Sequence, residues 1–150
     1  MKIFKILFVN FLLTENTKIS YIYLQPSIGL MNKIIHSVNL TKIYGEKETS
    51  VTALDNINVE FKENEFTAIM GPSGSGKSTL LHCLAGLDRP TSGQIFLKEE
   101  DISTLNDKQL TKIRRDSFGF VFQAFNLIPT LTAEENITLP ASIAGRKPDM

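Results

Sequence analysis

The sequence predicts an α/β fold with two parts: a small antiparallel β subdomain, then the start of an α/β layer. Several strand-like segments lie between residues 33 and 61 with no helical pattern between them, which is typical of an antiparallel sheet. The apolar run "FTAIM" is then followed by a glycine-rich loop and a helical pattern. The order strand, loop, helix opens an α/β layer.

The antiparallel part is expected to come from the segments that precede the glycine-rich loop. Residues 33–40 form a short strand in this interpretation. Between residues 51 and 61, Ile57, Val59 and Phe61 alternate with polar residues, which predicts a half-buried strand. Residues 62–65 are a turn, and residues 94–98 follow the turn formers of "LDRPTSG" as a further strand.

The α/β part is predicted from residue 66 onward. Residues 66–70 are expected to form a buried strand, and residues 78–86 a helix with Leu80, Leu81 and Leu84 on its apolar side. A second helix is predicted at 107–115 and a second buried strand at 118–123. Thr132 and Glu135 have the spacing of a capping box, so a helix starts there, and Pro140 is expected to interrupt it.

The segment from Gly71 to Ser78 fits the pattern G-x-x-x-x-G-K-[ST], a P-loop. Glycine lacks Cβ, so the backbone can approach an anion closely, and the following helix directs free N–H groups toward the same anion. Lys77 can reach the β- and γ-phosphates, and the Ser78 hydroxyl can bind Mg²⁺. The pattern therefore predicts a site for a nucleoside triphosphate and Mg²⁺, rather than a flexible linker, formed by Gly71, Pro72, Ser73, Gly74, Ser75, Gly76, Lys77, Ser78 and Thr79.

The overall charge balance gives no indication of a nucleic-acid partner. The 150 residues include 16 basic and 16 acidic side chains. The single cysteine, Cys83, excludes an internal disulfide and fits a reducing compartment. Its neighbour His82 faces another direction on a helix, so no metal site is predicted there, and His36 is expected to be structural.

The first 30 residues are expected to lie outside the working domain. "MKIFKILFVNFLL" has a basic start and an apolar run, as a signal peptide does, but no small-residue cleavage site follows and the run is too short to span a bilayer. We favour a mis-assigned start codon, with an accessory extension or a membrane-associating segment as alternatives. The domain is then residues 31–150.

From Met31 onward the chain resembles the N-terminal half of an ATP-binding cassette (ABC) transporter nucleotide-binding subunit. The residues that carry the resemblance are "NLTKIYG", "AIMGPSGSGKSTLLHCLAGLDRPTSGQI", "FGFVFQAFNLIPTLTAEENITLP" and "AGRKPD". They are most similar to subunits that serve lipoprotein release, macrolide export and antimicrobial-peptide resistance. The resemblance implies a P-loop NTPase fold, with an antiparallel β subdomain and an incomplete RecA-like core.

The resemblance also implies residue roles. Tyr44 matches the aromatic residue that stacks on adenine. Gln123 matches the Q-loop glutamine, which contacts Mg²⁺ and the attacking water, so it joins Lys77 as an expected catalytic residue. Residues 125–130 match the region near the membrane partner. The implied partners are a transmembrane permease and a second nucleotide-binding subunit, at the cytoplasmic face of the cell membrane.

Several of the family's motifs are not in the 150 residues. The "LSGGQ"-type signature, the acidic Walker B strand with its glutamate, and the switch histidine belong downstream in such subunits. We therefore expect that the sequence is a fragment of a longer subunit. Alone, it is expected to bind ATP weakly and to hydrolyse essentially none, because the 150 residues lack the Walker B glutamate that would polarise the water and the signature that would close the site.

Three alternatives remain open at this stage. "GPSGSGKST" also resembles guanylate kinases, although in those the P-loop lies near the start of the chain. A cassette ATPase without a transport role, of the cell-division type, is a second alternative. A truncated product with no activity is the third.

Overall fold

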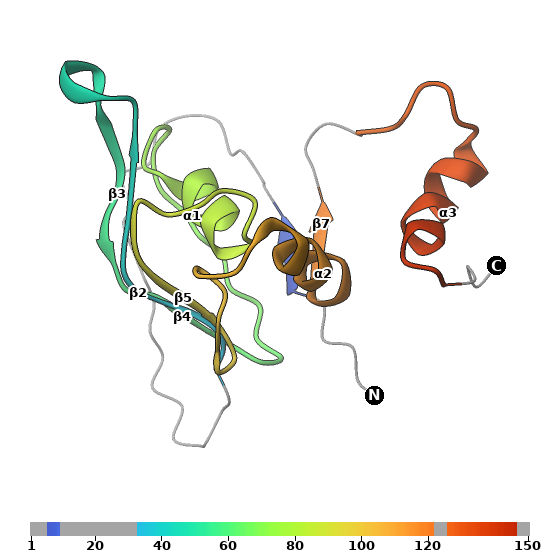
Figure 1. Ribbon diagram of the computed structural model, residues 1–150, viewed down its shortest axis with the longest axis horizontal. Helices are drawn as coiled ribbons and strands as arrows, with labels where there is room; N and C mark the ends of the chain where they lie inside the picture. The colour runs from blue at the N-terminus through green and yellow to red at the C-terminus, as the bar shows by residue number, and fades with distance from the viewer. Residues whose placement is uncertain (1–5, 10–32, 122–125, 147–150) are drawn as a thin grey trace. The chain divides into compact units, whose positions relative to one another are not determined.

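The computed structural model describes residues 6–9, 33–121 and 126–146 (Figure 1). The chain divides into two compact units, residues 13–114 and residues 1–12 with 115–150. The elements of the first unit are β2 (Lys33–Tyr44), the short 3-10 helix η1 (Lys47–Thr49), β3 (Val51–Ile57), β4 (Glu60–Lys62), α1 (Lys77–Leu84), β5 (Ser92–Leu97) and β6 (Glu100–Asp101). The helix α2 (Asp107–Ser117) crosses the boundary, and the second unit contains β1 (Ile6–Val9), β7 (Phe118–Val121) and α3 (Ala133–Ile143).

The first unit is built on an antiparallel sheet, as predicted. The strand order is β3-β2-β5-β6, and β4 also pairs with β2. The side chains of Ile35, Leu40 and Ile95 are fully buried and form the centre of its core. Burying such aliphatic side chains stabilises the unit by roughly 1.5–3 kcal/mol each.

Two of the predicted strands have different bounds. The strand β2 continues to Tyr44, beyond residue 40, because its second half pairs with β3 in a hairpin. The alternating strand predicted from Ile57, Val59 and Phe61 is not continuous, because Ile57 ends β3 and Phe61 lies in β4, with residues 58 and 59 outside both. Asn58 explains the division, because its amide oxygen accepts from the Asn39 N–H at 2.9 Å and its Nδ2 donates to the Asn56 carbonyl at 2.9 Å. These side-chain bonds replace the regular strand ladder there.

The helix α1 packs against β2 and β3, which places the glycine-rich loop at one edge of the sheet (Figure 1). The side chains of Leu80, Cys83 and Leu84 are its buried face, whereas Leu81 is half-buried and His82 is exposed. The helix ends where Gly86 takes φ 64°, a left-handed conformation that terminates helices. The predicted helix at 78–86 is therefore confirmed.

The prediction of a buried strand at residues 66–70 is wrong for this structure. The segment has no strand assignment, and the side chains of Phe66 and Met70 are 90% and 62% exposed. A buried parallel strand needs hydrogen-bonded neighbours on its sides. The strands that the structure describes pair among themselves and none of them pairs with 66–70, so the apolar pattern alone does not produce a strand.

The remaining predicted elements form, with one correction. The helix α2 is capped by Asn106, whose Oδ1 accepts from the Gln109 N–H at 3.0 Å. The strand β7 pairs in parallel with β1, while residues 122 and 123 of the predicted strand lie outside the described residues. The capping box of Thr132 and Glu135 is present.

Pro140 does not interrupt the last helix, contrary to the prediction. It lies inside α3, which continues to Ile143. The proline ring suits the helical φ, and the helix continues although the ring removes one backbone donor and crowds the carbonyl of Asn136, four residues earlier. Among the described residues, no helix is both long enough and apolar enough to cross a bilayer.

Candidate functional site

The glycine-rich loop precedes α1 and takes a conformation that depends on its glycines. Gly74 and Gly76 have φ values of 79° and 82°, in the left-handed region. Gly76 is also the N-cap of α1, and a Cβ atom there would lie 2.4 Å from the Ala53 carbonyl oxygen of β3. Only glycine fits this position, because a side chain would collide with backbone and strain φ at once.

The ammonium group of Lys77 lies over the loop. Its Nζ donates to the carbonyl oxygens of Gly71 at 2.8 Å and Pro72 at 2.6 Å, and to the Ser75 hydroxyl at 3.2 Å. The side chain therefore folds back across the loop, and its positive charge is concentrated at the N-terminus of α1. An anion there would meet both this charge and the positive end of the helix dipole.

The first turn of α1 supplies further anion donors. The first intrahelical hydrogen bond runs from the Leu80 N–H to the Gly76 carbonyl at 2.8 Å. The amides of Lys77, Ser78 and Thr79 thus precede the helical ladder and have no intrahelical acceptor. Ser78 is exposed and Thr79 half-buried, so hydroxyl and amide groups lie together at the helix start.

The structure thus brings the nine predicted loop residues together at one site. Pro72, Ser73, Gly74, Ser75 and Ser78 are exposed to solvent, whereas Gly71, Gly76, Lys77 and Thr79 are half-buried. The donor set fits a nucleoside triphosphate with Mg²⁺: backbone amides and an ammonium for phosphate oxygens, and the Ser78 hydroxyl for the metal ion. Within residues 6–9, 33–121 and 126–146, no group of three or more His, Cys, Asp or Glu side chains forms a separate metal site.

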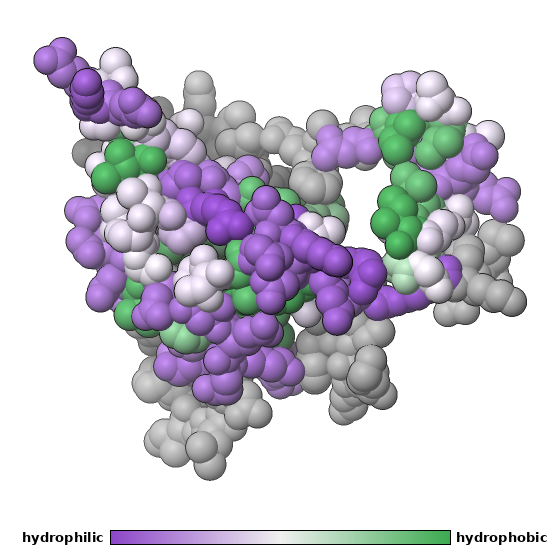
Figure 2. All heavy atoms as spheres, viewed as in Figure 1, coloured by the Kyte–Doolittle hydropathy of each residue, from purple (hydrophilic) through white to green (hydrophobic). Residues whose placement is uncertain are grey.

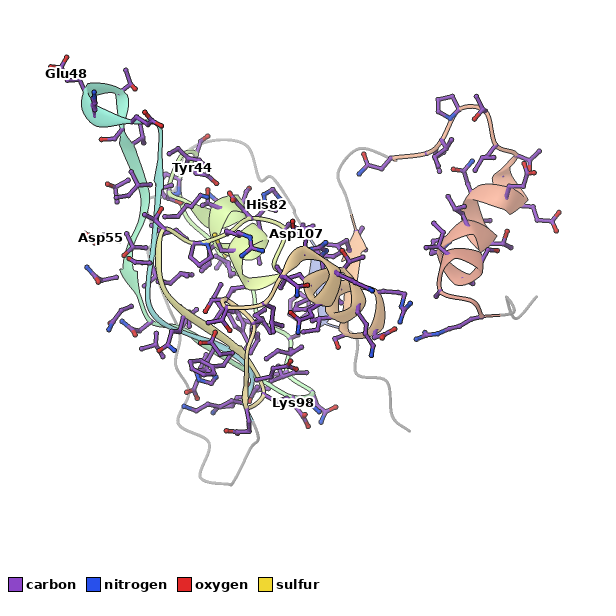
Figure 3. The ribbon with its side chains drawn as sticks, in the orientation of Figure 1. Tyr44, Glu48, Asp55, His82, Lys98 and Asp107 are labelled. Carbon is purple, nitrogen blue, oxygen red and sulfur yellow. The ribbon has the colours of Figure 1, made fainter. Side chains whose placement is uncertain are left out.

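Tyr44 is the last residue of β2, the strand that packs against α1, and it is labelled in Figure 3. Its hydroxyl donates to Asp88 Oδ2 at 2.6 Å, and the residue is 42% exposed. The hydrogen bond to Asp88 and partial burial raise the pKa of the Tyr44 phenol, and the side chain of Thr79 acts in the opposite direction. Since β2 also packs against α1, Tyr44 lies on a strand that contacts the helix following the phosphate loop.

Lys42 and Asp88 are additional site residues that the sequence did not indicate. Lys42 Nζ donates to Asp88 Oδ1 at 2.7 Å and lies 4.7 Å from the centroid of the Tyr44 ring. Partial burial would raise the pKa of Asp88, but the hydrogen bonds from Lys42 and Tyr44 outweigh it and lower that pKa. The contacts join residues more than 40 positions apart, so no local spacing could have indicated them.

Other residues singled out in the sequence contribute less to this site. Gln123 and Phe125 lie outside the described residues, so their predicted roles are not tested. Burial raises the pKa of the Cys83 thiol to about 11, which keeps it protonated at neutral pH. His36 has a structural contact, with its ring stacked on Phe96 at a centroid distance of 4.8 Å.

Comparison with known proteins identifies relatives that share this site region. The family model described as "ABC transporter" matches residues 54–149. A protein of Methanocaldococcus jannaschii named "Uncharacterized ABC transporter ATP-binding protein MJ0796" is 55% identical over 102 residues, which are 68% of this chain and 43% of that protein. The lipoprotein-releasing system ATP-binding protein LolD of Geobacter metallireducens is 47% identical over 117 residues, covering 78% of this chain and 52% of the relative.

A solved structure agrees with the sequence comparison. The dimeric structure of a post-hydrolysis state of the ATP-binding cassette MJ0796, bound to ADP and Pi, matches with a TM-score of 0.70 and 50% identity. The match covers 77% of this chain and 50% of the other. The chain therefore spans about half the length of the relatives that it matches, and the shared part includes the glycine-rich loop.

Proposed function

The chain belongs to the ABC transporter family, and from this premise we propose that it forms the ATP-binding part of a transport ATPase subunit. The observation that carries the proposal is the loop 71–76 with Lys77 at the start of α1. It combines left-handed glycines, helix amides without intrahelical acceptors and one ammonium group. This combination suits a triphosphate better than it suits any uncharged ligand.

Each site residue has a proposed role in that function. The loop amides and Lys77 bind the phosphates, with Lys77 drawn from its carbonyl contacts toward the β- and γ-oxygens. Ser78 supplies a hydroxyl to Mg²⁺, and Gln123 supplies a second oxygen and contacts the attacking water. Tyr44 stacks on the adenine. Mg²⁺ would neutralise charge on the triphosphate as the terminal bond breaks.

The proposed process is export or extraction of a lipophilic or peptide substrate through a separate permease. The relative named for a lipoprotein-releasing system supports transport over a role in cell division. The relative solved as a dimer supports pairing with a second nucleotide-binding subunit. We place the subunit at the cytoplasmic face of the membrane, where ATP is available and a permease partner can hold it.

We further propose that residues 31–150 form the working part and that residues 1–30 are dispensable. The family match begins at residue 54, and the sheet of the first unit begins at Lys33. A polypeptide that starts at Met31 should bind nucleotide as well as the complete chain. Weaker binding by the shorter polypeptide would assign a role to the β1–β7 pairing instead.

A binding measurement tests the central proposal. Fluorescent ATP with Mg²⁺ should bind the chain, and Lys77→Ala should weaken binding by at least roughly tenfold, as expected when a charge-assisted phosphate contact is lost. Lys108→Ala is the matched control, since Lys108 is an exposed lysine on α2 and lies outside the loop. Equal binding by the Lys77 variant and the wild type would contradict the proposed site.

A further inference from the structure

Tyr44 is held in place by a small network of charged and polar groups. The carboxylate of Asp88 accepts from the Tyr44 hydroxyl at 2.6 Å on one oxygen and from Lys42 Nζ at 2.7 Å on the other. Lys42 Nζ also donates to the Arg89 carbonyl at 2.7 Å. Both oxygens of Asp88 are therefore occupied by groups of β2, which fixes the carboxylate in one orientation.

The network connects the ring to the helix that starts at the phosphate loop. The amides of Leu87 and Asp88 donate to the His82 carbonyl of α1 at 2.9 Å and 3.2 Å, which ties Asp88 to the C-terminal end of that helix. The strand β2, which carries Tyr44, also packs directly against α1. All of these residues belong to the unit of residues 13–114.

The same network covers Tyr44 only in part. Lys42 Nζ lies over the ring at 4.7 Å from its centroid, within the range of a cation–π contact. The residue is nevertheless 42% exposed. Lys42 and Asp88 therefore cover Tyr44 only in part, and solvent-accessible surface remains on which a flat ligand could stack.

We propose that Asp88, held by Lys42, is a positioning residue that presents the Tyr44 ring to the base of the bound nucleotide. The inference rests on the proposed function, because it assumes that a nucleoside triphosphate occupies the loop. A freely rotating tyrosine would lose side-chain entropy on stacking, and a ring already fixed by hydrogen bonds avoids this loss. The contribution of Asp88 is thus to affinity for the base and not for the phosphates.

The simpler alternative is that Asp88 and Lys42 only join β2 to the loop after α1. The Tyr44→Phe variant separates the two explanations, because it keeps the ring and the Lys42–Asp88 ion pair but removes the hydroxyl that Asp88 holds. If the Lys42–Asp88 ion pair were purely structural, Tyr44→Phe would leave the affinity for ATP unchanged. A positioning role requires that Tyr44→Phe and Asp88→Asn lower by the same factor the part of the ATP affinity that comes from the base.

The experiment compares two probes that differ in the presence of a base. Titration calorimetry with Mg²⁺ measures binding of ATP and of inorganic tripolyphosphate to the complete chain. Asp88→Asn and Tyr44→Phe should each weaken ATP binding by about fivefold, the lower end of what a base–aromatic stack contributes, and leave tripolyphosphate binding unchanged. The double variant should lose no more than either single variant, because both remove the same contact.

Asp107→Asn is the matched control. Its carboxylate also accepts from a basic side chain, Arg89 Nη2 at 2.8 Å, but it makes no contact with Tyr44. This variant should bind both probes as the wild type does. A loss of tripolyphosphate binding by Asp88→Asn equal to its loss of ATP binding would overturn the positioning role, and so would an unaffected Tyr44→Phe variant. If the wild type binds neither probe, the proposed function fails and the inference fails with it.

A second measurement tests the network without any nucleotide. The chain has three tyrosines and no tryptophan, so phenolate absorbance is unobscured, and the difference between wild type and Tyr44→Phe isolates Tyr44. Because the hydrogen bond to Asp88 raises the pKa of this phenol, Asp88→Asn should lower it. An unchanged titration would show that Asp88 does not hold the ring, and would contradict the proposal directly.

Discussion

Gly74 and Gly76 show at the scale of single residues how the loop depends on missing side chains. Both have φ near 80°, yet their surroundings differ. A Cβ at Gly74 would meet no atom within 4 Å, whereas a Cβ at Gly76 would lie 2.4 Å from the Ala53 carbonyl oxygen. The two positions therefore separate backbone strain from steric collision.

Alanine at these two positions should have unequal effects. Gly74→Ala should lower the free energy of unfolding by about 1–2 kcal/mol, the usual cost of a left-handed non-glycine residue. Gly76→Ala should cost clearly more, since β3 or α1 must also shift, and should weaken ATP binding too. Urea unfolding of both variants gives the comparison. Equal losses would indicate that the contact with Ala53 is relieved by a small movement.

The Asp88 carboxylate gives a prediction about pH. Its pKa is lower in the folded protein than its ordinary value because Lys42 and Tyr44 donate to the ionised form. The stabilisation is therefore complete above the unfolded pKa of about 4 and is lost as the pH falls through the lower folded pKa. At neutral pH, Asp88→Asn should lower the free energy of unfolding by about 1 kcal/mol, a value reduced for partial exposure.

Urea unfolding of wild type and Asp88→Asn between pH 7 and pH 3 measures this difference. It should be constant down to about pH 5 and then shrink toward zero as Asp88 becomes protonated in the wild type. A difference that stays the same at pH 3 would show that the lost stability comes from packing and not from the charge of the carboxylate.

At the scale of elements, the segment from residue 126 to α3 carries exposed apolar side chains. Leu127, Ile137 and Ile143 are 64%, 78% and 71% exposed, and Figure 2 shows apolar atoms gathered on this part of the chain. The helix is nevertheless well started by its capping box. A segment with an ordered helix that leaves several apolar side chains unburied is typical of a contact surface, which fits the proposed permease partner.

This surface should also make the isolated polypeptide self-associate. Replacing Ile137 and Ile143 by Glu should increase the soluble, monomeric fraction in light scattering, because like charges replace apolar contacts. Glu134→Gln and Thr138→Ala, on the same helix, provide a control for unspecific changes. If the charged variant aggregates as strongly as the wild type, the association arises elsewhere, for example at the exposed segment 66–70.

Predictions from the sequence agreed with the structure where the deciding residues lie close together in the chain. The spacing of Gly71, Gly76 and Lys77 was sufficient to predict the loop, and Thr132 with Glu135 was sufficient to predict a capping box, since both motifs lie within one turn or loop. The pattern of residues 66–70 predicted a strand wrongly, because a strand also requires neighbours. Lys42 and Asp88 could not be found, since only the folded hairpin brings them to Tyr44.

At the scale of the whole molecule, the motifs present in these 150 residues limit their ability to hydrolyse ATP. They contain a phosphate-binding loop, but neither an "LSGGQ"-type motif nor an apolar strand that ends in an acidic pair. Attack of water on a γ-phosphate needs a group that orients or deprotonates the water and further charge on the transferring phosphoryl group. The loop with Lys77 supplies only part of this set.

We therefore expect that a polypeptide of residues 1–150, made alone, binds Mg²⁺-ATP but does not hydrolyse it. Phosphate release should equal that of Lys77→Ala purified in the same way, since this variant lacks the main phosphate contact and reports any contaminating ATPase. Turnover clearly above that background, and abolished by the Lys77 change, would contradict the expectation. It would mean that the described loop recruits a water-activating group from within these residues, and Gln123 would be the first candidate to replace.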